Sequence, residues 1–379
     1  MSQSSALRPR LTRQQRREQS LHTLRDLATN LQAAVNHSIA FGGNYEAVEV
    51  IAFHWSNDTM GVASLETELL EFLTRVYAYH CESYEIPTQN SAALLNSKLV
   101  NWSLERANKN TLRIYVYSGH AAGMGPEDLS WTIAGESNAD GTIAGPRLNI
   151  KSVLYSCETL EGDCLYIFDC CSAGSIGLWD GPEAIAACGW EQASSANLNF
   201  CLTRVLIDAL VDNNGAPITV ASLFARLFRN ASQNQVGACP VHIPKSNHPS
   251  ITLKPLSIRD FRPSRHPRFS ERVLLSIEVK DDHSERDVKA WEAWLSSNIP
   301  EDVLSVDIKI EATFQSHSTV LLITVPLEVW TMLPDHPGYN FVSHVTSNNG
   351  FSANRVALPH RPAQPRGENE PLSPRKPVR

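Results

Sequence analysis

The sequence predicts an α/β protein in which a parallel-rich β-sheet lies between helices, followed by a smaller α+β module. Three observations carry this prediction. Short apolar runs alternate with helical apolar periodicity over residues 45–255, as expected for a parallel sheet. Residues 256–271 are rich in proline and arginine, which indicates a linker. Residues 272–347 then predict the order βαββαβ, which is the order of a ferredoxin-like split arrangement.

The predicted elements follow from hydrophobic periodicity. Apolar side chains three and four residues apart predict an N-terminal helix within residues 20–44, ended by Gly42 and Gly43. In the first domain, strands are predicted at 47–53, 112–117, 164–168, 184–188, 241–243 and 251–253, with helices at 62–79, 91–104, 148–155, 200–211 and 220–229. In the second, strands are predicted at 273–279, 303–314, 319–325 and 341–346, with helices at 284–297 and 327–333.

Composition limits the class of protein. The chain has 379 residues, 42% of them hydrophobic, which is enough for two packed domains. The net charge of −7 gives no global reason to expect nucleic acid or an anionic membrane as partner. Positive charge gathers at both ends of the chain, so we expect a disordered basic arm over residues 1–19 and a disordered tail over 348–379.

Targeting and redox signals favour a cytoplasmic protein, and nuclear localisation stays open. We see no secretory signal and no apolar run of the roughly 18 residues that a membrane helix needs. The eight cysteines show no CxxC spacing, so we expect reduced thiols, no metal site and no cofactor.

Two segments carry the candidate chemistry. His120 and Cys171 each follow an apolar β-run that stops at small residues. In a parallel sheet, chemistry lies beyond the carboxyl ends of the strands, so the imidazole and the thiol are expected to share one crevice. The two residues are 51 positions apart in the sequence.

This pair of side chains is suited to acyl transfer. A cysteine thiol, with an ordinary pKa near ~8.5, reacts as its thiolate. The imidazole of His120 would accept the thiol proton and later protonate the leaving amine. Backbone N–H groups of Cys171 and of Ala121 or Gly119 would hold the oxyanion. We interpret Asp169 as fixing the loop through backbone N–H groups rather than as a reacting group.

Three motifs resemble those of caspases and metacaspases, the C14-type peptidases of clan CD. SGHA at 118–121 resembles the family's Ser-Gly-His-Gly, and DCCSAG at 169–174 resembles its Asp-x-Cys-His-Ser-Gly. ACGWEQAS, which begins at Ala187, resembles Gly-Cys-x-Asp-x-Gln-Thr-Ser. The resemblance implies a caspase-like cysteine endopeptidase over residues 45–255, acting on a protein or peptide through Cys171 and His120. It also implies that Trp190 and Glu191 line the substrate pocket.

The sequence departs from the family pattern at several positions. Ala121 replaces the glycine after the histidine, and Ser172 and Ala173 replace the His-Ser pair after the nucleophile. Ser64-Leu65 stands where metacaspases carry Asn-Asp, which weakens the expectation of specificity for basic residues. We see no dense aspartate cluster for calcium.

Two other functions remain open. The first is a catalytically inactive caspase-like scaffold for protein–protein interaction, like the N-terminal domain of the signalling protein raptor. The second places the function in the ferredoxin-like module, as a peptide- or oligomer-binding unit. A regulatory protein partner could use the N-terminal helix or this module. Nucleic acid is not expected, because residues 271–347 lack a basic stripe.

Overall fold

The computed structural model describes residues 22–39, 45–123, 131–174, 181–188, 198–199, 201–233, 239–258, 271–280, 308–315 and 318–347. The expected basic arm and tail, most of the linker and the helix expected at 284–297 lie outside these residues.

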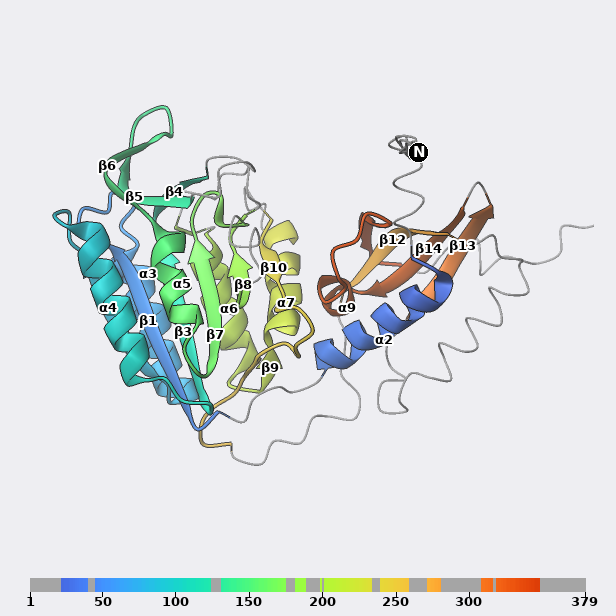
Figure 1. Cartoon of the computed structure of the whole chain (residues 1–379), viewed down its shortest axis with the longest axis horizontal. Coiled ribbons are helices and arrows are strands. Elements are labelled where there is room, and N and C mark those ends of the chain that lie inside the picture. Colours follow the sequence, from blue (N-terminus) through green and yellow to red (C-terminus); the bar gives the residue numbers. More distant parts are fainter. Residues whose placement is uncertain are drawn as a thin grey trace, which may run out of the picture. The chain divides into compact units, whose positions relative to one another are not determined.

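A six-stranded sheet forms the centre of the first part of the chain (Figure 1). The strands follow the spatial order β10-β8-β7-β3-β1-β2. They are parallel except β10, which runs antiparallel to β8. Their bounds are Val241–Ile243 for β10, Glu183–Ala186 for β8, Asp163–Asp169 for β7, Thr111–Ser118 for β3, Ala47–Trp55 for β1 and His80–Ile86 for β2. The predicted parallel-rich sheet is confirmed.

Helices cover both faces of this sheet because alternate strand residues point to opposite sides. On one face, Ile114 and Ile167 share a core with helices α3, α6 and α7. On the other face, Tyr115 and Phe168 share a core with α4 and α5. All eight residues of β3 are buried, as a central parallel strand requires. The helix bounds are Ala63–Phe72 for α3, Ser91–Glu105 for α4, Ile150–Glu158 for α5, Leu202–Asn213 for α6 and Val220–Gln233 for α7. A five-residue π-helix, η1, extends α3 over Leu73–Tyr77.

Two small sheets in this part of the chain were not predicted. Strands β4 (His120–Gly123), β5 (Trp131–Ser137) and β6 (Ile143–Asn149) form an antiparallel sheet directly after β3. The helix expected from residue 148 therefore begins at Ile150, where Asn149 caps it by accepting the Lys151 N–H at 3.1 Å. Strands β9 (Ile218–Thr219) and β11 (Thr252–Leu253) form an antiparallel pair.

The C-terminal part contains a four-stranded antiparallel sheet with the order β13-β14-β12-β15. Its elements are β12 (Arg272–Val279), β13 (Lys309–Gln315), β14 (Thr319–Pro326), α9 (Leu327–Thr331) and β15 (Tyr339–Val345). Strand β12 alternates partly buried and buried residues, so only one of its faces packs in the core. Because the helix expected at 284–297 is not among the described residues, the ferredoxin-like arrangement stays a prediction.

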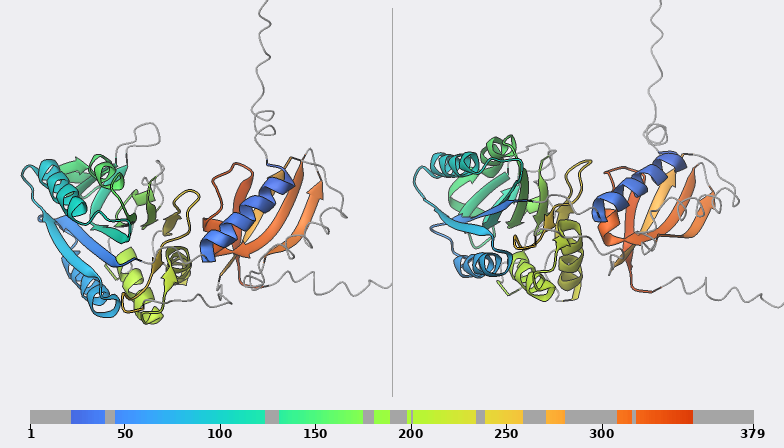
Figure 2. Two further views of the ribbon diagram at one scale, coloured as in Figure 1. Left: turned by 60° about the horizontal axis from the view of Figure 1, so that its bottom comes forward. Right: turned by 90° about the horizontal axis from the view of Figure 1, so that it is seen from below.

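The N-terminal helix α2 (Leu24–Ile39) packs against this C-terminal sheet (Figure 2). Its buried residues Leu27, Leu31 and Val35 share one core with Leu275 of β12 and Ile323 of β14. The apolar stripe predicted from three-four spacing is therefore real, and its partner is a sheet more than two hundred residues away.

Candidate active site

The carboxyl ends of β3 and β7 carry the two candidate reactive side chains. These strands are parallel neighbours, and Ser118 of β3 is paired in register with Asp169 of β7. His120 and Cys171 each stand two residues beyond this pair. Neighbouring strands lie about 4.8 Å apart. The segments that follow β3 and β7 therefore begin next to each other at the same edge of the sheet.

Gly119 makes the turn between β3 and β4. Its φ is +149°, and a Cβ at this position would lie only 2.7 Å from Tyr117 Oη. The Gly119 N–H donates to the Asp169 carbonyl at 3.2 Å, which ties the two strand ends together. This bond occupies the Gly119 N–H, which removes one of the two donors considered beside Cys171 for an oxyanion.

Tyr117 lies beneath both reactive segments. Its hydroxyl donates to the carbonyl of His120 at 2.9 Å and lies 3.3 Å from that of Ala134. Burial raises the pKa of this hydroxyl well above its usual range, and the neighbouring Cys170, Asp58 and Cys171 raise it further.

The His120 ring is half-buried and contacts a threonine. Its Nε2 lies 3.2 Å from Thr59 Oγ1, in the loop that follows β1. Burial lowers the pKa of His120 below its ordinary value, and Asp58 opposes this effect. The imidazole is therefore largely neutral at pH 7, which is the state that a general base needs.

The two adjacent cysteines have different surroundings. Cys170 is fully buried, and burial raises its thiol pKa well above the usual value. Cys171 is partly exposed. The following residue, Ser172, has a φ of +53°, a left-handed conformation that is uncommon for a residue other than glycine. Of the two thiols, Cys171 is thus the one that solvent and a substrate can reach.

Asp169 is held by the first turn of α6. Its Oδ2 accepts from the Thr203 N–H at 2.8 Å and from the Thr203 hydroxyl at 2.7 Å. The carboxylate thereby satisfies a free N–H of the helix and lies at the positive end of the helix dipole. The nearby hollow has a volume of only about 10 Å³ and is lined by Met60, Val62, Leu65, Ser118, Asp169, Leu198, Cys201 and Thr203.

The structure brings Gly119, His120, Ala121, Asp169 and Cys171 to one edge of the sheet. The two substrate-binding candidates, Trp190 and Glu191, lie outside the described residues. Sequence reasoning missed Thr59 and Thr203. A polar residue just beyond the first strand was the available signal for Thr59. Nothing in the sequence marked Thr203, because its partner Asp169 is 34 positions away.

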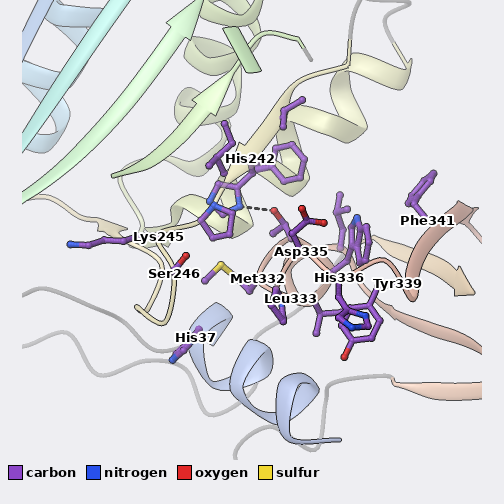
Figure 3. A pocket seen from close by; sticks show the side chains of 18 of the residues that line it. His37, His242, Lys245, Ser246, Met332, Leu333, Asp335, His336, Tyr339 and Phe341 are labelled. Atoms are coloured by element: carbon purple, nitrogen blue, oxygen red, sulfur yellow. Dashed lines mark hydrogen bonds between the residues drawn. The ribbon is translucent and has the colours of Figure 1, made fainter. Parts of the chain in front are cut away.

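A separate cavity of about 1060 Å³ lies elsewhere in the molecule (Figure 3). Its lining includes His37 of α2, Phe224 of α7, His242 of β10 and Trp330 of α9. The imidazole Nδ1 of His242 lies 2.6 Å from Thr331 Oγ1, and its Nε2 lies 2.8 Å from Glu183 Oε1. Neither His120 nor Cys171 lines this cavity, so its size says nothing about the candidate active site.

The described residues contain no cluster of three or more His, Cys, Asp or Glu side chains that could hold a metal ion. Among the same residues, no helix combines the length and the apolar character needed to cross a membrane.

The mostly parallel six-stranded sheet, with helices on both of its faces, defines an α/β fold. The chain is similar in structure to caspase-1 of Spodoptera frugiperda, with 10% identity and a TM-score of 0.42 over 56% of this chain and 92% of that one. It is also similar to the Drosophila initiator caspase Dronc, with 7% identity and a TM-score of 0.37 over 55% and 83% of the two chains. A protein of Geobacter sulfurreducens gives 11% identity and a TM-score of 0.34 over 48% and 89%.

These likenesses concern the fold alone. The sequence itself matches no protein-family model and no curated protein.

Proposed function

We propose that the chain is a cysteine endopeptidase that uses Cys171 as nucleophile and His120 as general base and acid. One observation carries the proposal: His120 and Cys171 stand at the same offset beyond a register-paired Ser118 and Asp169. Two rigid neighbouring strands thus direct an imidazole and an accessible thiol to one edge of the sheet.

In the proposed reaction, His120 takes the thiol proton and the Cys171 sulfur attacks the scissile carbonyl carbon. The carbonyl oxygen becomes an oxyanion that the N–H groups of Cys171 and Ala121 would hold. The C–N bond then breaks, and the amine leaves with the proton from His120. Water hydrolyses the resulting thioester and regenerates the thiol.

A panel of fluorogenic peptides with basic, acidic and apolar residues before the reporter tests the proposal. The Cys171→Ala variant should lose hydrolysis while keeping the unfolding midpoint of the parent. Cys239→Ala, which removes an exposed thiol, is the matched control and should retain activity. Equal rates for the parent and Cys171→Ala would exclude Cys171 as the nucleophile.

A caspase-like scaffold without peptidase activity is the second candidate. The departures from the family pattern at Ala121, Ser172 and Ala173 favour it. Alkylation by iodoacetamide near neutral pH separates the candidates, because an activated thiolate reacts fast and a structural thiol does not. The Cys171→Ala variant measures the background from the other thiols.

We also infer a ferredoxin-like arrangement for residues 272–345. The strand order β13-β14-β12-β15 and the antiparallel pairing support it. A helix over residues 284–297, packed on the sheet, is the element that this inference requires. Backbone chemical shifts of these residues provide the test, and extended values throughout would contradict it.

A further inference from the structure

A second thiol, that of Cys188, lies beside the segment that carries the candidate nucleophile. Cys188 stands two residues beyond Ala186 of β8, and Cys170 stands two residues beyond Phe168 of β7. Ala186 and Phe168 are paired in register, and the Ala187 N–H donates to the Phe168 carbonyl at 2.9 Å. The segments that follow β7 and β8 therefore begin side by side.

The segment 170–174 is hydrogen-bonded to Cys188 at both of its ends. The Cys188 thiol donates to the Cys170 carbonyl at 3.4 Å, and the Cys188 carbonyl accepts from the Gly174 N–H at 2.8 Å. The Cys170 carbonyl belongs to the same peptide group as the Cys171 nitrogen. The Cys188 sulfur therefore lies against the backbone of Cys171.

The three thiols at this place differ in their exposure. Cys171 is partly exposed, whereas Cys170 and Cys188 are buried. Burial raises the pKa of the Cys188 thiol to about 11, the Ala173 N–H opposes this rise, and Cys171 adds to it. Cys188 is therefore protonated at neutral pH, and oxidants react with exposed thiolates. A dissolved oxidant meets Cys171 first.

Of the two buried thiols, Cys188 is the better partner for an oxidised Cys171. Cys170 is adjacent to Cys171 in the chain, and adjacent cysteines form a disulfide only with strain. Cys188 comes from a neighbouring strand end. Strands lie about 4.8 Å apart, within the roughly 4.4–6.8 Å that usually separates the Cα atoms of a disulfide.

We propose that Cys188 is the resolving thiol of Cys171, so that a peroxide joins the two residues in a reversible disulfide. The Cys171 sulfur attacks a peroxide oxygen, the O–O bond breaks, and water leaves as the sulfur is oxidised to a sulfenic acid. The Cys188 sulfur then attacks the Cys171 sulfur, the S–O bond breaks, and the leaving hydroxide takes the Cys188 proton as a second water. A dithiol reduces the disulfide and is itself oxidised, which regenerates both thiols.

The consequence for catalysis rests on the proposed function. The disulfide occupies the sulfur that would attack the scissile carbonyl, so the oxidised protein should not hydrolyse peptides. Formation of the disulfide itself depends only on the placement of the two cysteines, and it can be measured without a substrate.

The first measurement uses the full chain treated with hydrogen peroxide, with the remaining thiols then blocked by N-ethylmaleimide. Chymotrypsin, which cuts after Phe168, Trp179 and Trp190, separates the peptide of Cys171 from that of Cys188. Mass spectrometry should find these two peptides joined, and a dithiol should separate them. The absence of a joined peptide would overturn the inference.

Three serine variants identify the sulfurs that are joined. Cys188→Ser keeps a donor for the Cys170 carbonyl but should give no joined peptide, and its Cys171 should proceed to the sulfinic acid. Cys170→Ser should still give the joined peptide. Cys157→Ser is the matched control and should behave like the parent, because Cys157 is also buried and donates to the Val153 carbonyl at 3.7 Å.

Thermal unfolding shows whether each variant keeps the structure of the parent. Fragmentation of the parent's joined peptide between Cys170 and Cys171 identifies the bridged sulfur without any variant. A bridge from Cys188 to Cys170 would overturn the inference.

The second measurement follows hydrolysis of the best peptide in the panel. Before oxidation, Cys188→Ser should be as fast as the parent. Peroxide should stop hydrolysis in both proteins, and a dithiol should restore it only in the parent, because thiols do not reduce a sulfinic acid. Equal recovery of the two proteins would contradict the role of Cys188. If the parent hydrolyses nothing before oxidation, the proposed function fails, and the joined peptide still decides whether Cys188 resolves Cys171.

Discussion

Asp169 and Thr203 form a two-bond contact: one carboxylate oxygen accepts from the threonine N–H at 2.8 Å and from its hydroxyl at 2.7 Å. The contact joins the carboxyl end of β7 to the first turn of α6, directly beside the candidate nucleophile. Both residues are buried, so neither donor has water as a ready alternative partner.

Removing the carboxylate should therefore destabilise the protein. We expect Asp169→Ala to lower the free energy of unfolding by about 1–3 kcal/mol, because two buried donors lose their acceptor. Asp169→Asn should cost less, since its amide oxygen can still accept. Urea unfolding measures both variants. Thr203→Val, which removes only the hydroxyl donor, should fall between the parent and Asp169→Ala, and an Asp169→Ala variant as stable as the parent would refute the account.

Gly119 should not tolerate a side chain. We expect Gly119→Ala to lower the free energy of unfolding by about 1–3 kcal/mol, because of the positive φ and the collision with Tyr117 Oη. The double variant Gly119→Ala/Tyr117→Phe removes the colliding oxygen and should recover part of this loss. Chemical unfolding of the four proteins in this cycle gives the coupling energy, and strict additivity would show that the collision contributes nothing.

The protonation of His120 should occur at unusually acidic pH. Since burial lowers its pKa, the folded protein should show a His120 titration midpoint below the ordinary value of 6.5. Neutral imidazole then persists to lower pH, and the acidic limb of kcat/KM should move with it. Asp58→Asn should lower the midpoint further, because Asp58 raises the pKa. NMR titration provides the check, and a midpoint above 6.5 would contradict it.

Because of Glu328, we expect the free energy of unfolding to fall as the pH rises. Burial raises its pKa from 4.5 to about 8; Glu271 adds to the rise, and Arg226 opposes it. Between these two pH values the unfolded chain ionises the carboxyl while the folded chain does not, so stability falls as pH rises. The free energy of unfolding drops by about 1.4 kcal/mol for each pH unit in this interval. Above about pH 8 both states are ionised and the loss is complete.

Replacing this carboxyl should remove the effect. Glu328→Gln should raise Tm relative to the parent at about pH 9 and change it little at about pH 5. Glu105→Gln, at an exposed position, should show no such difference between the two conditions. Differential scanning measurements at both pH values decide the matter, and a Tm difference that does not grow with pH would be the contrary result.

The buried strands could be predicted from sequence because continuous apolar runs are their direct signature. The run at 112–117 lies within the fully buried strand β3, and the run at 164–168 lies within β7. The edge strand β2 was missed, since most of its residues are only partly buried or exposed and it lacks an apolar run. Strand β6 was missed because Gly145 and Pro146 indicate a break, which this strand tolerates since it pairs on one side only.

The candidate site was predictable to the extent that it follows strand ends. His120 and Cys171 stand where apolar runs stop, so the pattern alone placed them at one edge of the sheet. The contacts of Thr59 with His120 and of Thr203 with Asp169 depend on how loops and helices pack, which spacing along the chain does not encode. The contact of Gly119 N–H with Asp169 is of the same kind, and it removed one expected oxyanion donor.

The packing of α2 on the C-terminal sheet has a consequence for how the chain is made. A ribosome releases residues 24–39 long before strands β12, β14 and β15 exist, while β1, β3 and β7 become available in between. During that interval Leu27 and Leu31 have no sheet to cover them, and an uncovered apolar stripe favours aggregation or capture by a chaperone. The order of synthesis thus leaves this helix without its partner sheet until more than two hundred further residues have been made.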